Sequence, residues 1–165
     1  MAGTAVVSAD TRLVADIQSR AGSLTWEEGW IGDGMQLFIA QILVREAVGE
    51  EAAARSWLCA TYLSLEERAA GNPALATGGD PQQDAAWGAL WWNGLRHELS
   101  DVGLRDLLHV LTTRLGTSPA SLEDILAAAD DVMRRDMKPN FEPWLNARLI
   151  GETPAAALCG DERGK

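Results

Sequence analysis

Apolar residues recur along this chain three and four positions apart, which is the spacing of one face of an α-helix. No stretch shows the sustained alternation of apolar and polar residues that predicts a half-buried strand. Glycine and proline separate the apolar stretches, most clearly in GNPALATGGDP at 71–81. The pattern predicts an all-α fold, a single-domain bundle of six to seven helices.

Helix-capping residues place the expected boundaries. The predicted helices cover about 9–22, 34–48, 50–69, 81–100, 104–115, 122–137 and 140–150. Asp33 with Gln36 forms an expected capping box for the second helix. Asp80 followed by Pro81 opens the fourth, and the chain is expected to turn near 101–103. Ser121 with Asp124, or Ser118 before Pro119, begins the sixth, which we expect to end at Lys138.

The helix at about 34–48 is apolar on nearly all sides. A helix of that kind is normally buried, so we expect it at the centre of the bundle. No composition change divides the chain into separate domains. We therefore predict one helical domain over 1–158 and a flexible tail over 159–165.

Three of the seven tryptophans lie on the fourth predicted helix, in DAAWGALWWNGLRHEL at 84–99. At about 100° per residue, Trp87 and Trp91 share one side of that helix and Trp92 lies at its edge. Glu98 projects into the same apolar stripe, between these two tryptophans. An aromatic face of this kind suits a binding site, although packing in the core is the simpler explanation.

The chain is acidic, with 24 Asp and Glu against 14 Lys and Arg and a formal net charge of −10. Nucleic-acid binding needs a basic surface, so we expect no direct nucleic-acid partner, whereas a basic protein partner is electrostatically favoured. Cys59 and Cys159 are far apart in the sequence, and we expect no disulfide between them. Without a recognisable secretory signal or an apolar stretch long enough to span a membrane, the sequence predicts a soluble, cytoplasmic protein.

Candidate catalytic residues are few. Glu98 and Glu46 interrupt apolar faces near helix ends, where burial would raise the pKa of a carboxyl group. His97 stands next to Glu98, so the three form a weak acid–base set. With two histidines and no Glu-x-x-His motif, the sequence predicts no metal site and no cofactor. Whether the protein is an enzyme stays open, with the balance against it.

The leading hypothesis is a non-catalytic, acidic helical binding protein of the immunity, inhibitor or adaptor type that acts through a protein partner. One alternative is a protein that binds an apolar small molecule in a tryptophan-lined pocket. A less favoured alternative is an enzyme that uses Glu98 or Glu46 as acid or base. The expected partner-binding or ligand-binding residues are aromatic: Trp87, Trp91, Trp92, Trp26 and Trp30.

Overall fold

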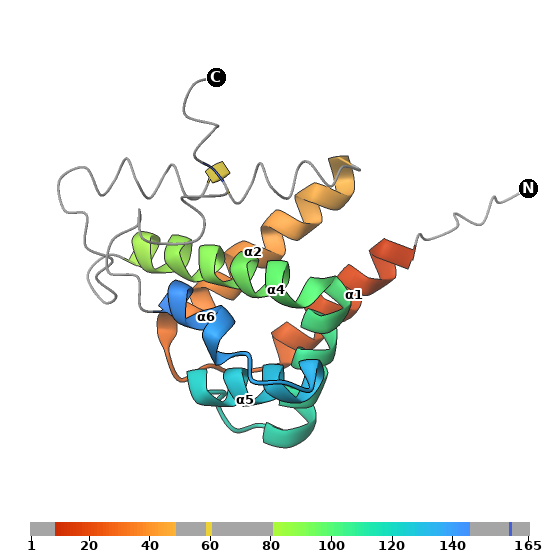
Figure 1. Ribbon diagram of the computed structural model, residues 1–165. Coiled ribbons are helices and arrows are strands. Elements are labelled where there is room, and N and C mark those ends of the chain that lie inside the picture. The colour runs from red at the N-terminus through yellow and green to blue at the C-terminus, as the bar shows by residue number, and fades with distance from the viewer. Residues whose placement is uncertain (1–8, 49–58, 61–80, 146–158, 160–165) are drawn as a thin grey trace, which may run out of the picture.

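The computed structural model describes residues 9–48, 59–60, 81–145 and 159, and over these ranges it contains five helices and no strand (Figure 1). The helices are α1 (Ala9–Ser23), α2 (Gly29–Val48), α4 (Pro81–Leu115), α5 (Leu122–Met133) and α6 (Lys138–Leu145). The all-α prediction is confirmed. The count of six to seven is not confirmed, since the helix expected over 50–69 lies almost wholly outside the described residues, as does the chain at 146–150.

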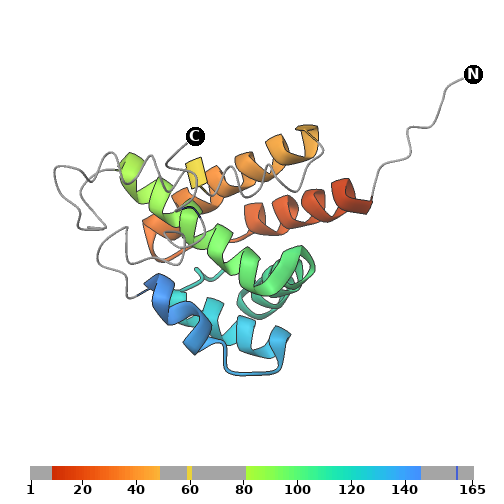
Figure 2. The ribbon, with the colours of Figure 1, turned by 45° about the horizontal axis from the view of Figure 1, so that its top comes forward.

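The long helix α4 holds the centre of the bundle. It packs against α1, α2, α5 and α6. Figure 2 shows α1 and α2 on one side of α4, and α5 and α6 on the other. The sequence placed α2 at the centre, but α2 exposes Gln36, Leu37 and Ala40 along one side. A helix with an apolar composition can therefore keep one side at the surface when a longer helix, here α4, packs against all the others.

A break at Ser100 divides α4 into two segments, as the turn predicted near 101–103 requires. Ser100 has φ 67° and ψ 170°, which no helical residue adopts. Its hydroxyl accepts a hydrogen bond from the backbone N–H of Gly103 at 3.3 Å and so caps the second segment. The guanidinium of Arg96 pairs with the carboxylate of Asp101 across the break. The two segments can therefore point in different directions while staying joined.

The helices α2 and α4 approach most closely at two glycines, Gly34 and Gly88. A Cβ atom added to Gly88 would lie 2.0 Å from the carbonyl oxygen of Trp30, and one added to Gly34 would lie 2.3 Å from Cα of Gly88. Both obstacles are backbone atoms, which cannot rotate away as a side chain would. The missing side chains therefore set the distance between the two helix axes.

Local capping signals predicted some helix ends correctly. Ser121 and Asp124 form the expected capping box of α5, and Gly116 ends α4 with φ +57°. Two other expectations are wrong. The helix α2 begins at Gly29, so Asp33 lies inside it instead of capping it. Lys138 begins α6, because α5 already ends at Met133.

The capping box makes the stability of α5 dependent on pH. Hydrogen bonds from the backbone N–H and then from the hydroxyl of Ser121 hold the pKa of Asp124 below its ordinary value. A carboxyl group whose pKa is lower in the folded state stabilises the fold at higher pH, and this contribution is lost below about pH 4.

We expect Ser121→Ala to lower the free energy of unfolding by about 1 kcal/mol at neutral pH, and by less in acid. Urea unfolding at both pH values checks this, with Ser118→Ala as the control on the same loop.

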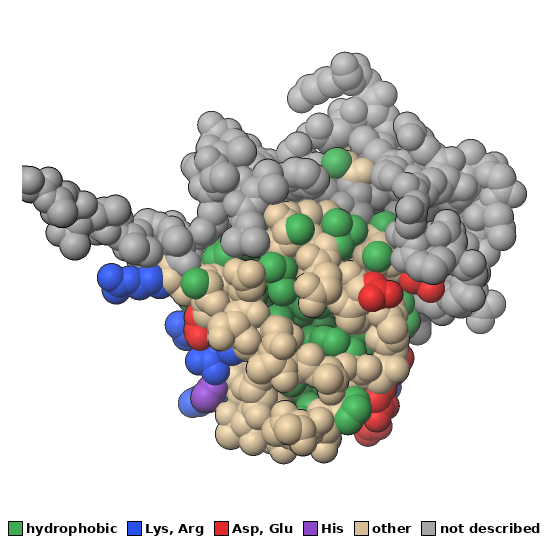
Figure 3. Space-filling model, turned by 180° about the vertical axis from the view of Figure 1, so that it is seen from behind, with side chains coloured by type: hydrophobic (Ala, Val, Ile, Leu, Met, Phe, Trp, Pro, Cys, Tyr) green, Lys and Arg blue, Asp and Glu red, His purple; other side chains and the backbone are tan. Residues whose placement is uncertain are grey.

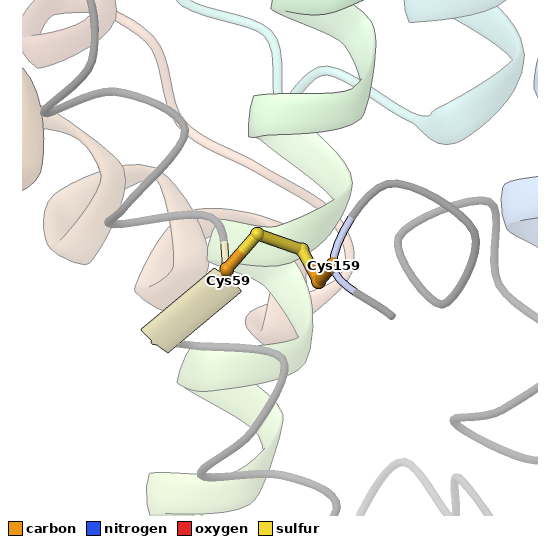
Figure 4. Close-up of a disulfide and its surroundings, with 2 residues drawn as sticks. All are labelled: Cys59 and Cys159. Carbon is orange, nitrogen blue, oxygen red and sulfur yellow. A yellow bond between two sulfur atoms is a disulfide. The ribbon is translucent and has the colours of Figure 1, made fainter. Parts of the chain in front are cut away.

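The two cysteines form a disulfide, which corrects the expectation from the sequence (Figure 4). The Cα atoms of Cys59 and Cys159 are 5.3 Å apart although 100 positions separate them in the sequence. Cys159 was expected to begin a flexible tail, yet its side chain is fully buried and covalently bonded. The bond ties a residue near the expected C-terminal end of the domain to one in its first half.

Candidate functional site

Four tryptophans form a continuous series of ring contacts between the segment 26–30, which leads into α2, and the first segment of α4. We call this series the indole chain. The ring centroids of Trp26 and Trp92 are 5.3 Å apart, those of Trp92 and Trp91 are 5.0 Å apart, and those of Trp91 and Trp30 are 5.5 Å apart. All three pairs meet edge to face, the arrangement that aromatic quadrupoles favour. Phe38 stacks on Trp92 at 6.5 Å.

Burial divides the tryptophans predicted as binding residues into two groups. Trp91 and Trp92 are 0% exposed and Trp87 is 6% exposed, so these three are core residues. Trp26 and Trp30 are partly exposed, at the two ends of the indole chain. The sequence placed Trp87, Trp91 and Trp92 correctly on one helix, but Trp30 lies inside α2, which begins earlier than expected. It did not show which of them reach the surface, because that depends on the helix packed opposite.

The two buried indoles in the middle of the indole chain differ in their hydrogen bonding. The Nε1 of Trp92 donates to the carbonyl oxygen of Ile31 at 2.9 Å, which joins α4 to the first turn of α2. The Nε1 of Trp91 is buried without a hydrogen-bond acceptor among the described residues. A buried N–H group without an acceptor costs about 1–3 kcal/mol. The surrounding contacts therefore hold Trp91 in place against that cost.

One face of α2 carries a mixed apolar and acidic surface that the sequence analysis did not single out. Trp30, Asp33, Leu37 and Ala40 follow one another at helical spacing, and we call them the α2 outer stripe. Trp30 is partly exposed, the other three are exposed, and Leu37 keeps 37% of its surface in solvent. The sequence did not indicate that Leu37 is exposed, and this exposure, which the structure shows, identifies the face.

Acidic side chains border the α2 outer stripe. Glu27 is exposed and Glu28 is partly exposed, just before the first residue of α2. This stretch is held in place by a bridge between Trp26 and Ala120. In that bridge the backbone N–H of Glu27 donates to the carbonyl oxygen of Ala120 at 2.9 Å. The backbone N–H of Ala120 donates in turn to the carbonyl oxygen of Thr25 at 2.8 Å. The two glutamates are therefore anchored to a fixed backbone.

The structure describes the side chains of two of the three acid–base candidates, Glu98 and His97. Glu98 is partly buried, and its carboxylate accepts a hydrogen bond from Nδ2 of Asn140 at 2.9 Å, which joins α4 to α6. His97, the neighbouring residue, is exposed. The side chain of Glu46 lies outside the described part of α2. Among the described residues, the contact of the Glu98 carboxylate is thus one that joins two helices.

A polar pair lies inside the core between α2 and α4. The Nδ2 of Asn93 donates to Oε1 of Gln41 at 2.9 Å and to the carbonyl oxygen of Ala89 at 2.9 Å. Both side chains are buried. Because burying an amide without partners is costly, such a pair favours one alignment of the two helices over shifted ones. We assign it a structural role.

Charged side chains are unevenly distributed over the visible surface. Figure 3 shows Lys and Arg mostly along one edge of the molecule and Asp and Glu mostly along the opposite edge. On α1, Arg20 pairs with Asp16 at 3.0 Å and lies 2.8 Å from Nδ1 of His109 on α4. The described residues contain no group of three His, Cys, Asp or Glu side chains that could hold a metal ion. No described helix is both long and apolar enough to cross a membrane.

Comparisons with protein-family models, with curated proteins and with solved structures find no match to this chain. Its function therefore has to be argued from the described residues themselves.

Proposed function

We propose that this chain is a binding protein that docks a basic segment of a partner protein on the α2 outer stripe. The observation that carries the proposal is the combination of a partly exposed tryptophan, an exposed leucine and an exposed aspartate on one helix face. Aromatic anchors surrounded by polar side chains are typical of the energetically dominant part of protein interfaces. The expected contacts are an apolar side chain on Leu37 and a Lys or Arg side chain beside Trp30.

The position of Trp30 is already set before any partner binds. Its ring contacts the fully buried Trp91 edge to face at 5.5 Å. Its backbone carbonyl lies where α2 and α4 approach closely at Gly88. A side chain held in this way loses little conformational entropy on binding, which favours affinity. The buried indoles thus support the exposed one without touching the partner.

Charge indicates the chemistry of the partner. The chain has a formal net charge of −10, and the exposed residues Glu27 and Asp33 lie three positions before and after Trp30 in the sequence. Carboxylates attract Lys and Arg, and the face of an indole ring attracts the same cations. A basic amphipathic segment would satisfy both the charged and the apolar parts of the α2 outer stripe.

The indole packing favours this proposal over an apolar-ligand pocket. Trp91 and Trp92 use their ring edges and faces on each other and on Trp26, Trp30 and Phe38. A ligand placed among these rings would have to replace contacts that are already made. The proposed docking surface needs no such rearrangement.

A synthetic amphipathic helix of lysine and leucine serves as the binding probe, and the same peptide with glutamate for lysine is its control. We expect the lysine peptide to shift the NMR signal of the Trp30 indole N–H and to leave that of Trp144, a buried residue on α6, in place. Asp33→Lys should weaken binding about tenfold, and Leu37→Ser by a similar factor, which corresponds to about 1.4 kcal/mol each. Added salt should weaken binding as well.

Glu142→Lys is the matched control, because it changes the net charge as Asp33→Lys does but lies exposed on α6. Its affinity for the peptide should stay within about twofold of the wild type, as expected for a distant exposed charge. An equal loss in both variants would mean that net charge alone attracts the peptide, and the α2 outer stripe would then not be the docking surface.

A further inference from the structure

The chain contains two cysteines, and the fold brings both into one buried bond. Cys59 and Cys159 have Cα atoms 5.3 Å apart, within the range that a disulfide requires. Figure 4 shows the two side chains directed at each other from separate segments. The sequence has no further cysteine that could compete for either partner. This pairing is therefore the one disulfide that the monomer can form.

The burial of both sulfurs distinguishes a structural bond from a reactive one. Cys59 is 2% exposed and Cys159 is 0% exposed. A cysteine that senses oxidants or attacks a substrate has to be accessible and to have a stabilised thiolate. Reducing enzymes and small thiols cannot reach these sulfurs unless the fold opens. The bond thus has the surroundings of a permanent cross-link.

We infer that the protein acquires the Cys59–Cys159 disulfide in an oxidising compartment and works there, outside the reducing cytosol. The two thiols lose two protons and two electrons, which pass to the disulfide of a thiol–disulfide oxidoreductase and leave that enzyme as a dithiol. Proteins that stay in the cytosol keep their thiols reduced, so they rarely depend on such a bond. The sequence predicted a cytoplasmic protein and no disulfide, and the buried bond between Cys59 and Cys159 is the observation that favours a different compartment.

The position of the bond in the sequence makes it important for stability. It closes a loop of 100 positions, and long loops lose the most conformational entropy when the unfolded chain is cross-linked. We expect the bond to raise the ratio of folded to unfolded protein by about a hundredfold. A protein with this dependence would be less stable in a reducing compartment.

The state of the cysteines in the cell tests the inference directly. The full chain is recovered from its own cells with an alkylating reagent present during lysis, and its intact mass is measured. We expect no alkyl group on either cysteine, and a peptide that links Cys59 to Cys159 after proteolysis. Alkylation of both residues in the freshly lysed cells would overturn the inference. Thiols that become bonded only after an oxidant is added to the cells would also overturn it, because they would indicate a redox switch.

Urea unfolding provides the second measurement. A reductant should lower the unfolding midpoint of the wild type and leave that of the Cys59→Ser/Cys159→Ser double variant unchanged. Reduced wild type keeps both sulfur atoms, so comparison with the double variant separates the loss of the bond from the change of side chain. An unchanged midpoint for the wild type under reductant would contradict the stabilising role.

Discussion

Gly88→Ala should be among the most destabilising single substitutions in the described part of the chain, and we expect it to lower the free energy of unfolding by about 3 kcal/mol. The new methyl group would lie 2.0 Å from the carbonyl oxygen of Trp30 and would force α2 away from α4. That separation would loosen the indole chain, since Trp30 lies on α2 and its ring partner Trp91 lies on α4. Urea unfolding followed by circular dichroism measures the loss.

Gly22→Ala is the matched control for this prediction. Gly22 lies near the end of α1, and a Cβ atom there would meet nothing within 4 Å. Alanine favours helix over glycine, so this variant should be as stable as the wild type or more stable by up to about 1 kcal/mol. If both variants lost stability equally, or if Gly88→Ala lost none, the close approach of α2 and α4 would not constrain the fold.

Trp92→Phe should lower the free energy of unfolding by about 3 kcal/mol. Trp91→Phe should lower it by a smaller amount, and the difference between the two variants should be about 2 kcal/mol. Both substitutions remove the same atoms from fully buried positions next to each other on α4. The first also breaks the hydrogen bond from the indole to the carbonyl oxygen of Ile31. The second removes an N–H group that is buried without an acceptor, which returns part of the packing loss. Thermal and urea unfolding of the two variants measure the difference.

Hydrogen exchange of the indole N–H groups gives a second readout for the same pair. The Trp92 signal should exchange only when the fold opens, because that N–H is both buried and hydrogen-bonded. In the Trp92→Phe variant, the contact between α4 and the first turn of α2 should open more readily. The measurement is the hydrogen exchange rate of the backbone N–H of Met35 on α2, which should increase. Equal stability losses in the two variants would mean that the Trp91 N–H is also satisfied.

The predicted binding residues show how far sequence reasoning reaches on this chain. Periodicity located Trp87, Trp91 and Trp92 on one helix, but helical spacing is the same for an aromatic face turned to a partner and for one turned to the core. The structure turns these three inward, so the proposed function moves to Trp30 and Leu37 on α2. Leu37 carried no distinguishing signal, because it stands in a helix that is apolar on most sides.

Glu98 shows the same limit for a charged residue. Its place in an apolar stripe near a helix end predicted a buried carboxyl group. In the structure Asn140, 42 positions away in the sequence, donates to this carboxylate, while the neighbouring Arg96 pairs with Asp101. The spacing of residues along one helix could not predict the contact with Asn140, because only the packing of α6 on α4 brings Asn140 close to Glu98.

The sequence by itself determined the all-α class, the start of α4 at Pro81, the break near Ser100 and the capping box of Ser121 with Asp124. These features depend on interactions between residues within about one helical turn of each other, which sequence patterns record. Tertiary structure decided the features that join distant segments. They are the central place of α4, the glycine contact between α2 and α4, the burial of Trp91 and Trp92, and the Cys59–Cys159 bond. Each depends on which helices lie side by side, and no local spacing in this chain specifies that.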